Sequence, residues 1–485
     1  MKRCLVACWL AAGALLAENR PPNVVIILAD DLGYGDVGCF GAKKCKTPNL
    51  DRMAGEGARF TSFYVAQAVC SASRAALMTG CYSNRVGMAG ALNHTSHEGI
   101  NPDEWLLPEM CKERGYATAA FGKWHLGTRP TFHPMRNGFD EFFGIPYSND
   151  NSKYHPSLAP EMPPLPLLDG EKVIETDPDQ SRFTSRITER AVSFIERNKS
   201  KPFFLYVPHV MPHVPIFASE RFKGKSGAGL YADVVSELDG SVGEILSAIQ
   251  RSGIDDHTLV IFFSDNGPFL SYGTHAGTGG SLREGKLTAF DGGVRVPCIM
   301  RWPGKVAAGR VCDEPVMAID LLPTVAELIG GKMPKKVIDG KNVLPLIIDR
   351  GDAPSPHEAL FFYAGSELQA VRMGKWKLHF PHAYLTVTEQ TRDDGKPAGY
   401  GKLKPLAITQ SGIEGIASRH GYGVKRIGES LYDLSVDAGE TTDVLRQHPD
   451  VAAKMRRLAD AMRADLGDGL TGVVGKVIRP AGKSN

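Results

Sequence analysis

Four short runs of consecutive apolar residues constrain most strongly what this chain of 485 residues can fold into. Unbroken apolar runs are typical of strands that are covered on both faces of a parallel sheet. The runs occupy residues 24–28, 117–121, 203–207 and 259–263. Amphipathic helical patterns lie between them, at residues 47–57, 105–114, 183–198 and 230–252. This alternation of strands and helices predicts an α/β fold with a large, mostly parallel sheet covered by helices.

Each apolar run ends at polar residues, which stand at positions 30–31, 123–125, 209 and 265–266. Ligands of open α/β sheets bind beyond the carboxyl ends of the strands, so these side chains are expected to meet there. Asp30, Asp31 and Asp265 offer carboxylates and Asn266 offers an amide carbonyl. Such hard oxygens suit Ca²⁺ and, less well, Mg²⁺. For either pair alone, helix capping or turn formation after a strand is the alternative role.

The chain is longer than one core ordinarily supports, so two domains are expected, over residues 21–352 and 353–485. A helix starting at Asp320 would close the first domain. The second domain is expected to be a small α+β domain with a short antiparallel sheet. Its elements are expected at residues 368–372, 376–380, 431–434 and 451–466. Residues 381–430 are weakly patterned, and a stretch of that length is often a functional loop.

The N-terminus has the layout of a secretory signal peptide over residues 1–20, with Lys2 and Arg3 before an apolar stretch. The alternatives are a buried first helix and a lipoprotein anchor. The apolar stretch is too short to span a bilayer, and the chain is not expected to be an integral membrane protein. A net charge of +2 with scattered signs argues against nucleic acid as a partner. The predicted location is secreted or periplasmic.

Seven cysteines remain after the predicted signal peptide. Because seven is odd, at least one stands outside any intramolecular disulfide, and Cys70 is the candidate. The other six pair in an oxidising compartment or are simply buried. Cys70 begins a helical pattern that also carries Arg74 one turn later, so both side chains can face one site. A helix N-terminus would lower the pKa of the thiol and welcome an anion.

Two longer strings make the chain recognisable. Residues 70–80, CSASRAALMTG, resemble the first signature of the type I sulfatases, and residues 115–126, GYATAAFGKWHL, resemble the second. The likeness extends over almost the whole chain and is greatest to the arylsulfatase A and N-acetylgalactosamine-6-sulfatase branch. It implies an alkaline phosphatase-like fold. Ala72 stands where many members carry proline, a variation that also occurs in the family.

The resemblance implies that Cys70 is oxidised to formylglycine by a separate maturation enzyme, and that the hydrated aldehyde attacks sulfur. Calcium would be bound by Asp30, Asp31, Asp265 and Asn266, and the modified Cys70 would contact the ion. The residues carried over to catalysis are Arg74, Lys123, His125, His213 and Lys286, with Ser148 and His209 as substrate contacts. Arg74 would hold the diol, His125 would accept its second proton, and His213 would bind the sulfate and could protonate the leaving alcohol. Taken singly, each has an ordinary structural role as its alternative.

The expected reaction is therefore hydrolysis of a sulfate monoester, either an aryl sulfate or a sulfated carbohydrate, to alcohol and sulfate. Fixed cations at the site suit the negative charge that develops during S–O cleavage. A phosphate or phosphonate ester hydrolase of the same fold is the second hypothesis. A non-catalytic protein that binds sulfated glycans, with Cys70 unmodified, is the third. Residues 148–168 and 381–430 are the loops expected to select the substrate.

Overall fold

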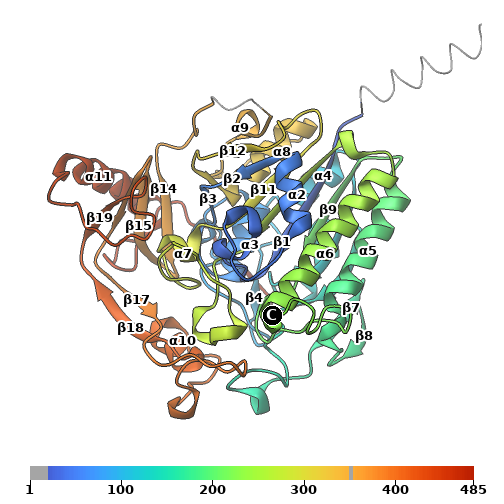
Figure 1. Cartoon of the computed structure of the whole chain (residues 1–485). Coiled ribbons are helices and arrows are strands. Elements are labelled where there is room, and N and C mark those ends of the chain that lie inside the picture. Colours follow the sequence, from blue (N-terminus) through green and yellow to red (C-terminus); the bar gives the residue numbers. More distant parts are fainter. Residues whose placement is uncertain (1–19, 349–352, 485) are drawn as a thin grey trace, which may run out of the picture.

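The computed structural model describes residues 20–348 and 353–484. Its largest feature is a ten-stranded sheet in the order β12-β2-β11-β10-β1-β9-β5-β6-β7-β8 (Figure 1). The strands are β1 (Asn23–Ala29), β2 (Ala58–Phe60), β5 (Ala117–Lys123), β6 (Glu141–Ile145), β7 (Pro166–Asp169), β8 (Lys172–Thr176), β9 (Phe203–Pro208), β10 (Thr258–Ser264), β11 (Cys298–Arg301) and β12 (Arg310–Cys312). The four predicted strands are the neighbours β10, β1, β9 and β5 at its centre, and they run parallel.

The central position of β1 explains why its sequence is apolar throughout. Val24, Ile26 and Leu28 belong to one hydrophobic core, and Val25 and Ile27 belong to the other. Successive side chains of a strand point to opposite faces, so a strand buried on both faces needs an apolar residue at every position. The prediction of a sheet covered on both sides is confirmed.

Helices cover the two faces as the alternating pattern predicts (Figure 1). One face packs on α2 (Pro48–Glu56), α5 (Phe183–Asn198) and α6 (Leu230–Arg251). The other packs on α3 (Cys70–Thr79), α4 (Leu107–Glu113) and α8 (Leu321–Ile329). Two further short helices are α7 (Asp291–Val294) and α9 (Leu344–Ile348). Toward the two edges the sheet has antiparallel pairs that were not expected: β11 is antiparallel to β10 and β2, and β7 is antiparallel to β6 and β8.

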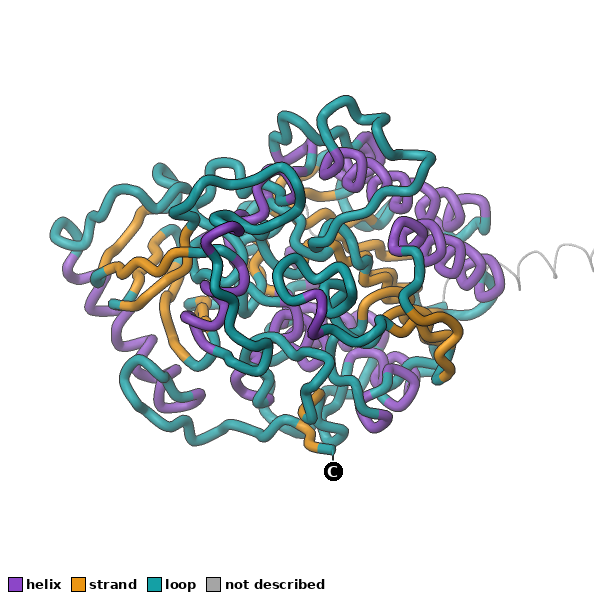
Figure 2. The backbone as a smooth tube through the Cα atoms, turned by 90° about the horizontal axis from the view of Figure 1, so that it is seen from below, coloured by secondary structure: helices purple, strands orange, loops and turns teal. Residues whose placement is uncertain are grey.

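The C-terminal part contains the expected antiparallel sheet, in the order β14-β15-β16-β19, with a long helix against it. These elements are β14 (Leu360–Ala364), β15 (Glu367–Met373), β16 (Trp376–His379), β19 (Ser430–Asp433) and α11 (Pro449–Leu466). In Figure 2 the two groups of strands lie apart, with loops and short helices between them. The boundary predicted at residues 352 and 353 falls beside residues outside the described ranges, and the two-domain division stays a prediction.

Residues 381–430 are not the unstructured loop that their composition indicated. They form a two-stranded sheet, β17 (His382–Thr386) with β18 (Gly423–Ile427), and helix α10 (Gly412–His420) packs on both strands. We call residues 382–427 the α10 unit. Its strands are short, and β18 is mostly exposed, so the sequence lacks a clear apolar period there. In residues 20–348 and 353–484, no helix is both long and apolar enough to cross a membrane. The predicted signal peptide, apart from residue 20, lies outside the described residues.

Candidate active site

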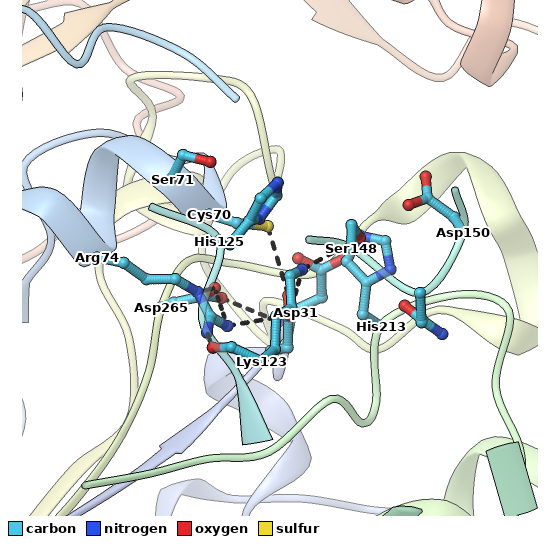
Figure 3. A network of polar contacts seen from close by, with 12 residues as sticks. Asp31, Cys70, Ser71, Arg74, Lys123, His125, Ser148, Asp150, His213 and Asp265 are labelled. Carbon is cyan, nitrogen blue, oxygen red and sulfur yellow. Dashed lines mark hydrogen bonds and ion pairs between the residues drawn. The ribbon is translucent and has the colours of Figure 1, made fainter. Parts of the chain in front are cut away.

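All but one of the polar residues that follow the central strands meet at one place, as the fold predicts (Figure 3). Asp30 follows β1, Asp265 follows β10, and Arg74 reaches them from the first turns of α3. The Arg74 guanidinium donates through Nε and Nη2 to Asp265 Oδ2, at 3.1 and 2.9 Å, and through Nη2 to Asp30 Oδ2 at 3.0 Å. Its Nη1 donates to the carbonyl of Lys123. The planar guanidinium thus joins three strand ends.

Lys286 forms the second ionic contact of the site. Its Nζ lies 2.7 Å from Asp31 Oδ1 and 3.3 Å from Cys70 Sγ. Burial raises the pKa of Asp31, and the neighbouring Asp30 and Asp265 raise it further, while the Lys286 ammonium opposes the shift. Lys286 therefore stands between the carboxylates and the position where a nucleophile at residue 70 would act.

The oxygen donors at the strand ends fit a hard divalent cation. Asp30, Asp31, Cys70 and His213 each place a ligand atom within 4.8 Å of the others. Asn266 Nδ2 donates to Asp31 Oδ1 at 2.7 Å, which leaves Asn266 Oδ1 buried without a hydrogen-bond partner in the described part of the chain. A buried amide oxygen without a partner is costly, and a bound cation would satisfy it. Asp30 and Asp31 of the four predicted ligands belong to this group. Asn266 contacts Asp31, and Asp265 shares the Arg74 guanidinium with Asp30. The oxygen chemistry of these four side chains suits calcium.

The expectation that the start of α3 lowers the pKa of the Cys70 thiol is wrong. Burial raises the pKa of this thiol well above its usual value, and Asp30 adds to the rise. Lys123 and Lys286 oppose it without overcoming the loss of water. An uncharged thiol is a poor nucleophile. The sulfur itself is therefore not set up to attack a substrate at neutral pH.

His125 is held in the form that a general base requires. Its Nε2 lies 2.7 Å from the carbonyl of Leu92, so this nitrogen carries the hydrogen. Its Nδ1 is buried and has no partner among the described residues. Burial, followed by the charges of Lys123 and Arg74, holds the pKa of the ring well below its usual value. The ring is therefore neutral, with a free lone pair on Nδ1 beside the site.

His213 presents its other nitrogen to the site. Its Nδ1 donates to the carbonyl of Val214, and its Nε2 lies 3.6 Å from Asp31 Oδ2. Burial lowers the pKa of the ring to about 3, and Lys286 and Lys123 contribute. Lys123 in turn donates to Asp30 Oδ2 at 2.6 Å and to Ser148 Oγ at 3.1 Å. The predicted Ser148 thus contacts the cationic side of the site.

Backbone conformation is unusual at several of these positions. Asp31 has φ of +65°, His125 has +60°, and Leu287, next to Lys286, has +72°. Side chains other than glycine adopt this left-handed region at a cost, and such residues gather at functional sites because the surrounding structure enforces them.

Comparisons with known proteins agree with this geometry. The family described as Sulfatase matches residues 22–331, and the C-terminal region of aryl-sulfatase matches residues 355–473. The chain belongs to the sulfatase family. Arylsulfatase A of Homo sapiens is 42% identical over 458 residues, which are 90% of this chain and 86% of the relative. N-acetylgalactosamine-6-sulfatase of Mus musculus is 42% identical over 391 residues, which are 76% of this chain and 73% of that relative.

A solved structure extends the likeness to the fold. The PsFucS1 sulfatase from Pseudoalteromonas sp. has a TM-score of 0.78 with 25% identity, over 93% of this chain and 92% of that one. The ten-stranded sheet is thus the alkaline phosphatase-like fold that the sequence resemblance implied. The chain is a sulfuric ester hydrolase. An aryl-named and a sugar-named relative are equally identical, so identity alone does not choose the substrate.

One predicted residue of this sulfatase stands apart from the rest. His209 is buried, its Nε2 lies 3.1 Å from Ser241 Oγ on α6, and it does not line the active-site cavity. For the cysteines, the sequence left open whether they pair or are simply buried. The seven that the structure describes are unpaired, and all but Cys39 are buried.

The sulfatase site opens into a cavity of about 560 Å³. Cys70, His125, Ser148, His213 and Lys286 line its floor. The rest of the lining mixes apolar side chains, such as Leu92, Ile413 and Ile416, with polar ones. Among the polar ones are four that the sequence did not reveal, namely Asp150, His155, Arg419 and His420. Asp150 and His155 fall in the first predicted substrate loop, but no local motif distinguishes them there. Arg419 and His420 reach the cavity only because α10 packs over it, and no pattern in the sequence indicates that.

Proposed function

We propose that this sulfatase hydrolyses sulfate monoesters through a formylglycine made from Cys70, with calcium at the four oxygen donors. The observation that carries the proposal is the placement of Cys70. Its side chain lies 3.3 Å from Lys286 Nζ and 3.5 Å from Asp30 Oδ1, at the floor of the cavity. The raised pKa of the thiol supports replacement of sulfur by oxygen, because the unmodified side chain would be inert there.

The modification is a two-electron oxidation. The Cβ–S bond of Cys70 breaks, sulfur leaves as hydrogen sulfide, an oxygen atom from water takes its place as the aldehyde, and two electrons pass to the oxidant. A separate maturation enzyme would supply the oxidant, which is dioxygen or a radical. Because Cys70 is buried at a cavity floor in the folded chain, we infer that the maturation enzyme acts on the segment before folding is complete. Addition of water to the aldehyde gives two geminal hydroxyl groups.

Hydrolysis then divides between the side chains of the site. One hydroxyl of residue 70 gives its proton to the free lone pair of His213 Nε2, and its oxygen forms a bond to sulfur as the bond from sulfur to the alcohol oxygen breaks. His213 Nε2 then passes that proton to the alcohol oxygen. His125 Nδ1 accepts the proton of the second hydroxyl. The carbonyl then reforms, the bond between carbon and the sulfate oxygen breaks, and sulfate leaves.

Negative charge on the sulfate oxygens would be met by Lys123 and Lys286, both buried. Cationic groups that are already in place need no reorganisation during the reaction, and losing one donor of this kind costs about a hundredfold to a thousandfold. Calcium bound at the strand ends would supply further positive charge and lower the pKa of a coordinated hydroxyl. Arg74 would hold Asp30 and Asp265 in place for the ion.

We also propose that the protein is secreted or periplasmic, on the signal-peptide pattern of residues 1–20. Expression with and without these residues, followed by fractionation and N-terminal sequencing, tests the export. Retention of the full-length chain in the cytoplasm of its native host would contradict it.

The central test is mass spectrometry of the peptide that carries residue 70, from protein made in the native host. Formylglycine lowers the peptide mass by about 18 Da, and its hydrate restores that loss. The same protein is assayed with the sulfate, phosphate and phosphonate esters of 4-nitrophenol. We expect the modification and a preference for sulfate, and we expect Cys70→Ala to abolish turnover. An unmodified thiol in active protein, or preference for phosphate or phosphonate, would overturn the proposal.

A further inference from the structure

The cavity is built from two parts of the chain that differ in chemistry. Its floor carries the cations and the nucleophile position, and its wall is formed partly by the α10 unit. His213 stands between the two, because it lies against Asp31 on one side and near Asp150 on the other (Figure 3). A sulfate on the floor would therefore direct its leaving alcohol past His213 toward the wall.

Asp150 supplies a hydrogen-bond acceptor on this wall. Its Oδ1 accepts from Asn151 Nδ2 at 3.0 Å, and the carboxylate has further lone pairs toward the cavity that it lines. Although burial opposes ionisation, a hydrogen bond from Ser148 and the charge of Lys123 are among the interactions that hold the pKa of Asp150 below its usual value. The wall thus presents a carboxylate that is ionised throughout the neutral range.

His155 supplies a donor next to this carboxylate. Its Nδ1 accepts from the backbone N–H groups of Ser157 and Leu158, at 3.2 and 2.9 Å, so Nε2 carries the hydrogen. His155 is only 3% exposed and lines the cavity. The His420 ring lies 6.3 Å from it, centroid to centroid, and is held through Nδ1 by the Tyr272 hydroxyl at 2.8 Å.

Arg419 completes the wall from the α10 unit. Its Nη1 donates to the carbonyls of Ala407 and Gln410. The guanidinium has five N–H donors in all, so most remain for a ligand in the cavity that Arg419 lines. Asp150 attracts this cation. No carboxylate forms an ion pair with it in residues 20–348 and 353–484, so its charge is not already neutralised by a close partner.

We propose that Asp150, His155, Arg419 and His420 form a subsite for the hydroxyl groups of a sugar ring, which makes the substrate a sulfated carbohydrate. The inference rests on the proposed sulfate ester hydrolysis. A sugar hydroxyl both donates and accepts, so neighbouring hydroxyls match a carboxylate beside N–H donors.

An aryl or steroid leaving group would fit this wall poorly. It would displace water from Asp150 and Arg419 without returning hydrogen bonds, and a buried charged group left unpaired is costly. Sites built to bind substrate hydroxyls reject analogues that lack them for this reason. The subsite therefore favours a sugar and disfavours an apolar alcohol.

The test compares two kinds of substrate in matched variants. kcat/KM is measured with 4-nitrophenyl sulfate and with a panel of monosaccharide sulfates that includes N-acetylgalactosamine 6-sulfate. We expect at least one sugar to be the better substrate. Asp150→Asn and Arg419→Gln should lower the ratio of sugar to aryl kcat/KM by about 10- to 100-fold, the value of a charged hydrogen bond. Arg426→Gln, an exposed arginine on β18 of the same unit, is the control and should leave the ratio unchanged.

Equal losses on both kinds of substrate would overturn the subsite, because a structural or purely chemical role predicts no change in the ratio. A second arm does not depend on turnover. Binding of the same sugars and of 4-nitrophenyl sulfate to Cys70→Ser protein is measured by calorimetry, with and without Asp150→Asn. Tighter binding of a sugar that the substitution weakens supports the subsite even if no ester is cleaved. If no sugar binds more tightly than the aryl sulfate, the inference is wrong, whether or not aryl sulfate is hydrolysed.

Discussion

Replacement of Lys286 by methionine separates the chemistry of the site from its folding. Lys286 Nζ lies 3.3 Å from Cys70 Sγ, so a sulfate bound to residue 70 would have an oxygen about 4 Å from this charge. Two unit charges at about 4 Å in an effective dielectric of about 20 interact by about 4 kcal/mol. The expected fall in kcat/KM for Lys286→Met is therefore about a thousandfold, and at least the hundredfold that one oxyanion donor is worth.

The stability of Lys286→Met should change much less than its activity. Breaking a buried ion pair costs about 3–5 kcal/mol when the partner charge stays. Asp31 avoids part of this cost, because its pKa is already raised by burial and it can take up a proton when Lys286 is gone. We expect the free energy of unfolding to fall by about 1–3 kcal/mol. Since Asp31 must be ionised to bind a cation, the acid limb of the activity profile should move to higher pH.

The assay is the pH dependence of kcat/KM with 4-nitrophenyl sulfate, next to urea unfolding of the same preparations. Lys305→Met, at an exposed lysine, controls for loss of a surface charge. Lys286→Arg, which keeps the charge, should recover part of the activity if the variant folds. Turnover of Lys286→Met within threefold of the parent, with calcium and residue 70 modified, would refute the electrostatic reasoning.

Three further predictions concern single features of the fold. Burial lowers the pKa of His209 to about 3 in the folded chain, so below pH 6.5 only the unfolded chain takes up its proton, and the free energy of unfolding falls by up to about 1.4 kcal/mol per pH unit. His209→Gln should remove this loss, which urea unfolding at pH 5 and pH 7 measures. Gly122→Ala should abolish soluble protein, because its Cβ would lie 1.8 Å from the carbonyl oxygen of Pro208, whereas Gly115→Ala, also at positive φ but with open space around it, should cost only about 1–2 kcal/mol. Calcium at a hundredfold its Kd should stabilise chelator-treated protein by about 2.7 kcal/mol, read as a rise in Tm, and Asp265→Asn should lose this response.

The centre of the sheet could be predicted from the sequence because burial on both faces leaves a visible mark. A strand such as β1 has no solvent-facing position, so every residue along it is apolar and the run stands out from its polar flanks. The edge strands β2 and β12 have three residues each, which is too short to show a period. They form only because β11 offers its edge to β2, and β2 offers its other edge to β12.

Within the site, too, some residues could be predicted from the sequence and others could not. Asp30, Asp265 and Arg74 were predictable because they stand at strand ends or in a long signature, and the structure joins them through hydrogen bonds. Arg419 was not, since it lies 345 residues beyond Arg74 and reaches the cavity through the packing of α10 alone. Arg419 belongs to a segment that reaches the cavity through tertiary packing, and no local periodicity or motif in the sequence shows that its side chain lines the cavity.

The charges at the cavity floor disfavour an unmodified cysteine as the nucleophile. Three carboxylates, from Asp30, Asp31 and Asp265, face three cations, from Arg74, Lys123 and Lys286, so these side chains alone attract an anion only weakly. In that balance a thiolate at residue 70 would add a buried negative charge, and burial accordingly raises the pKa of the thiol. A neutral diol adds no charge, and a divalent cation would leave the floor positive toward a sulfate monoanion. The arrangement is thus unfavourable for a thiolate at residue 70, which supports the proposed oxygen nucleophile, and the mass of residue 70 is the measurement on which the proposed mechanism depends.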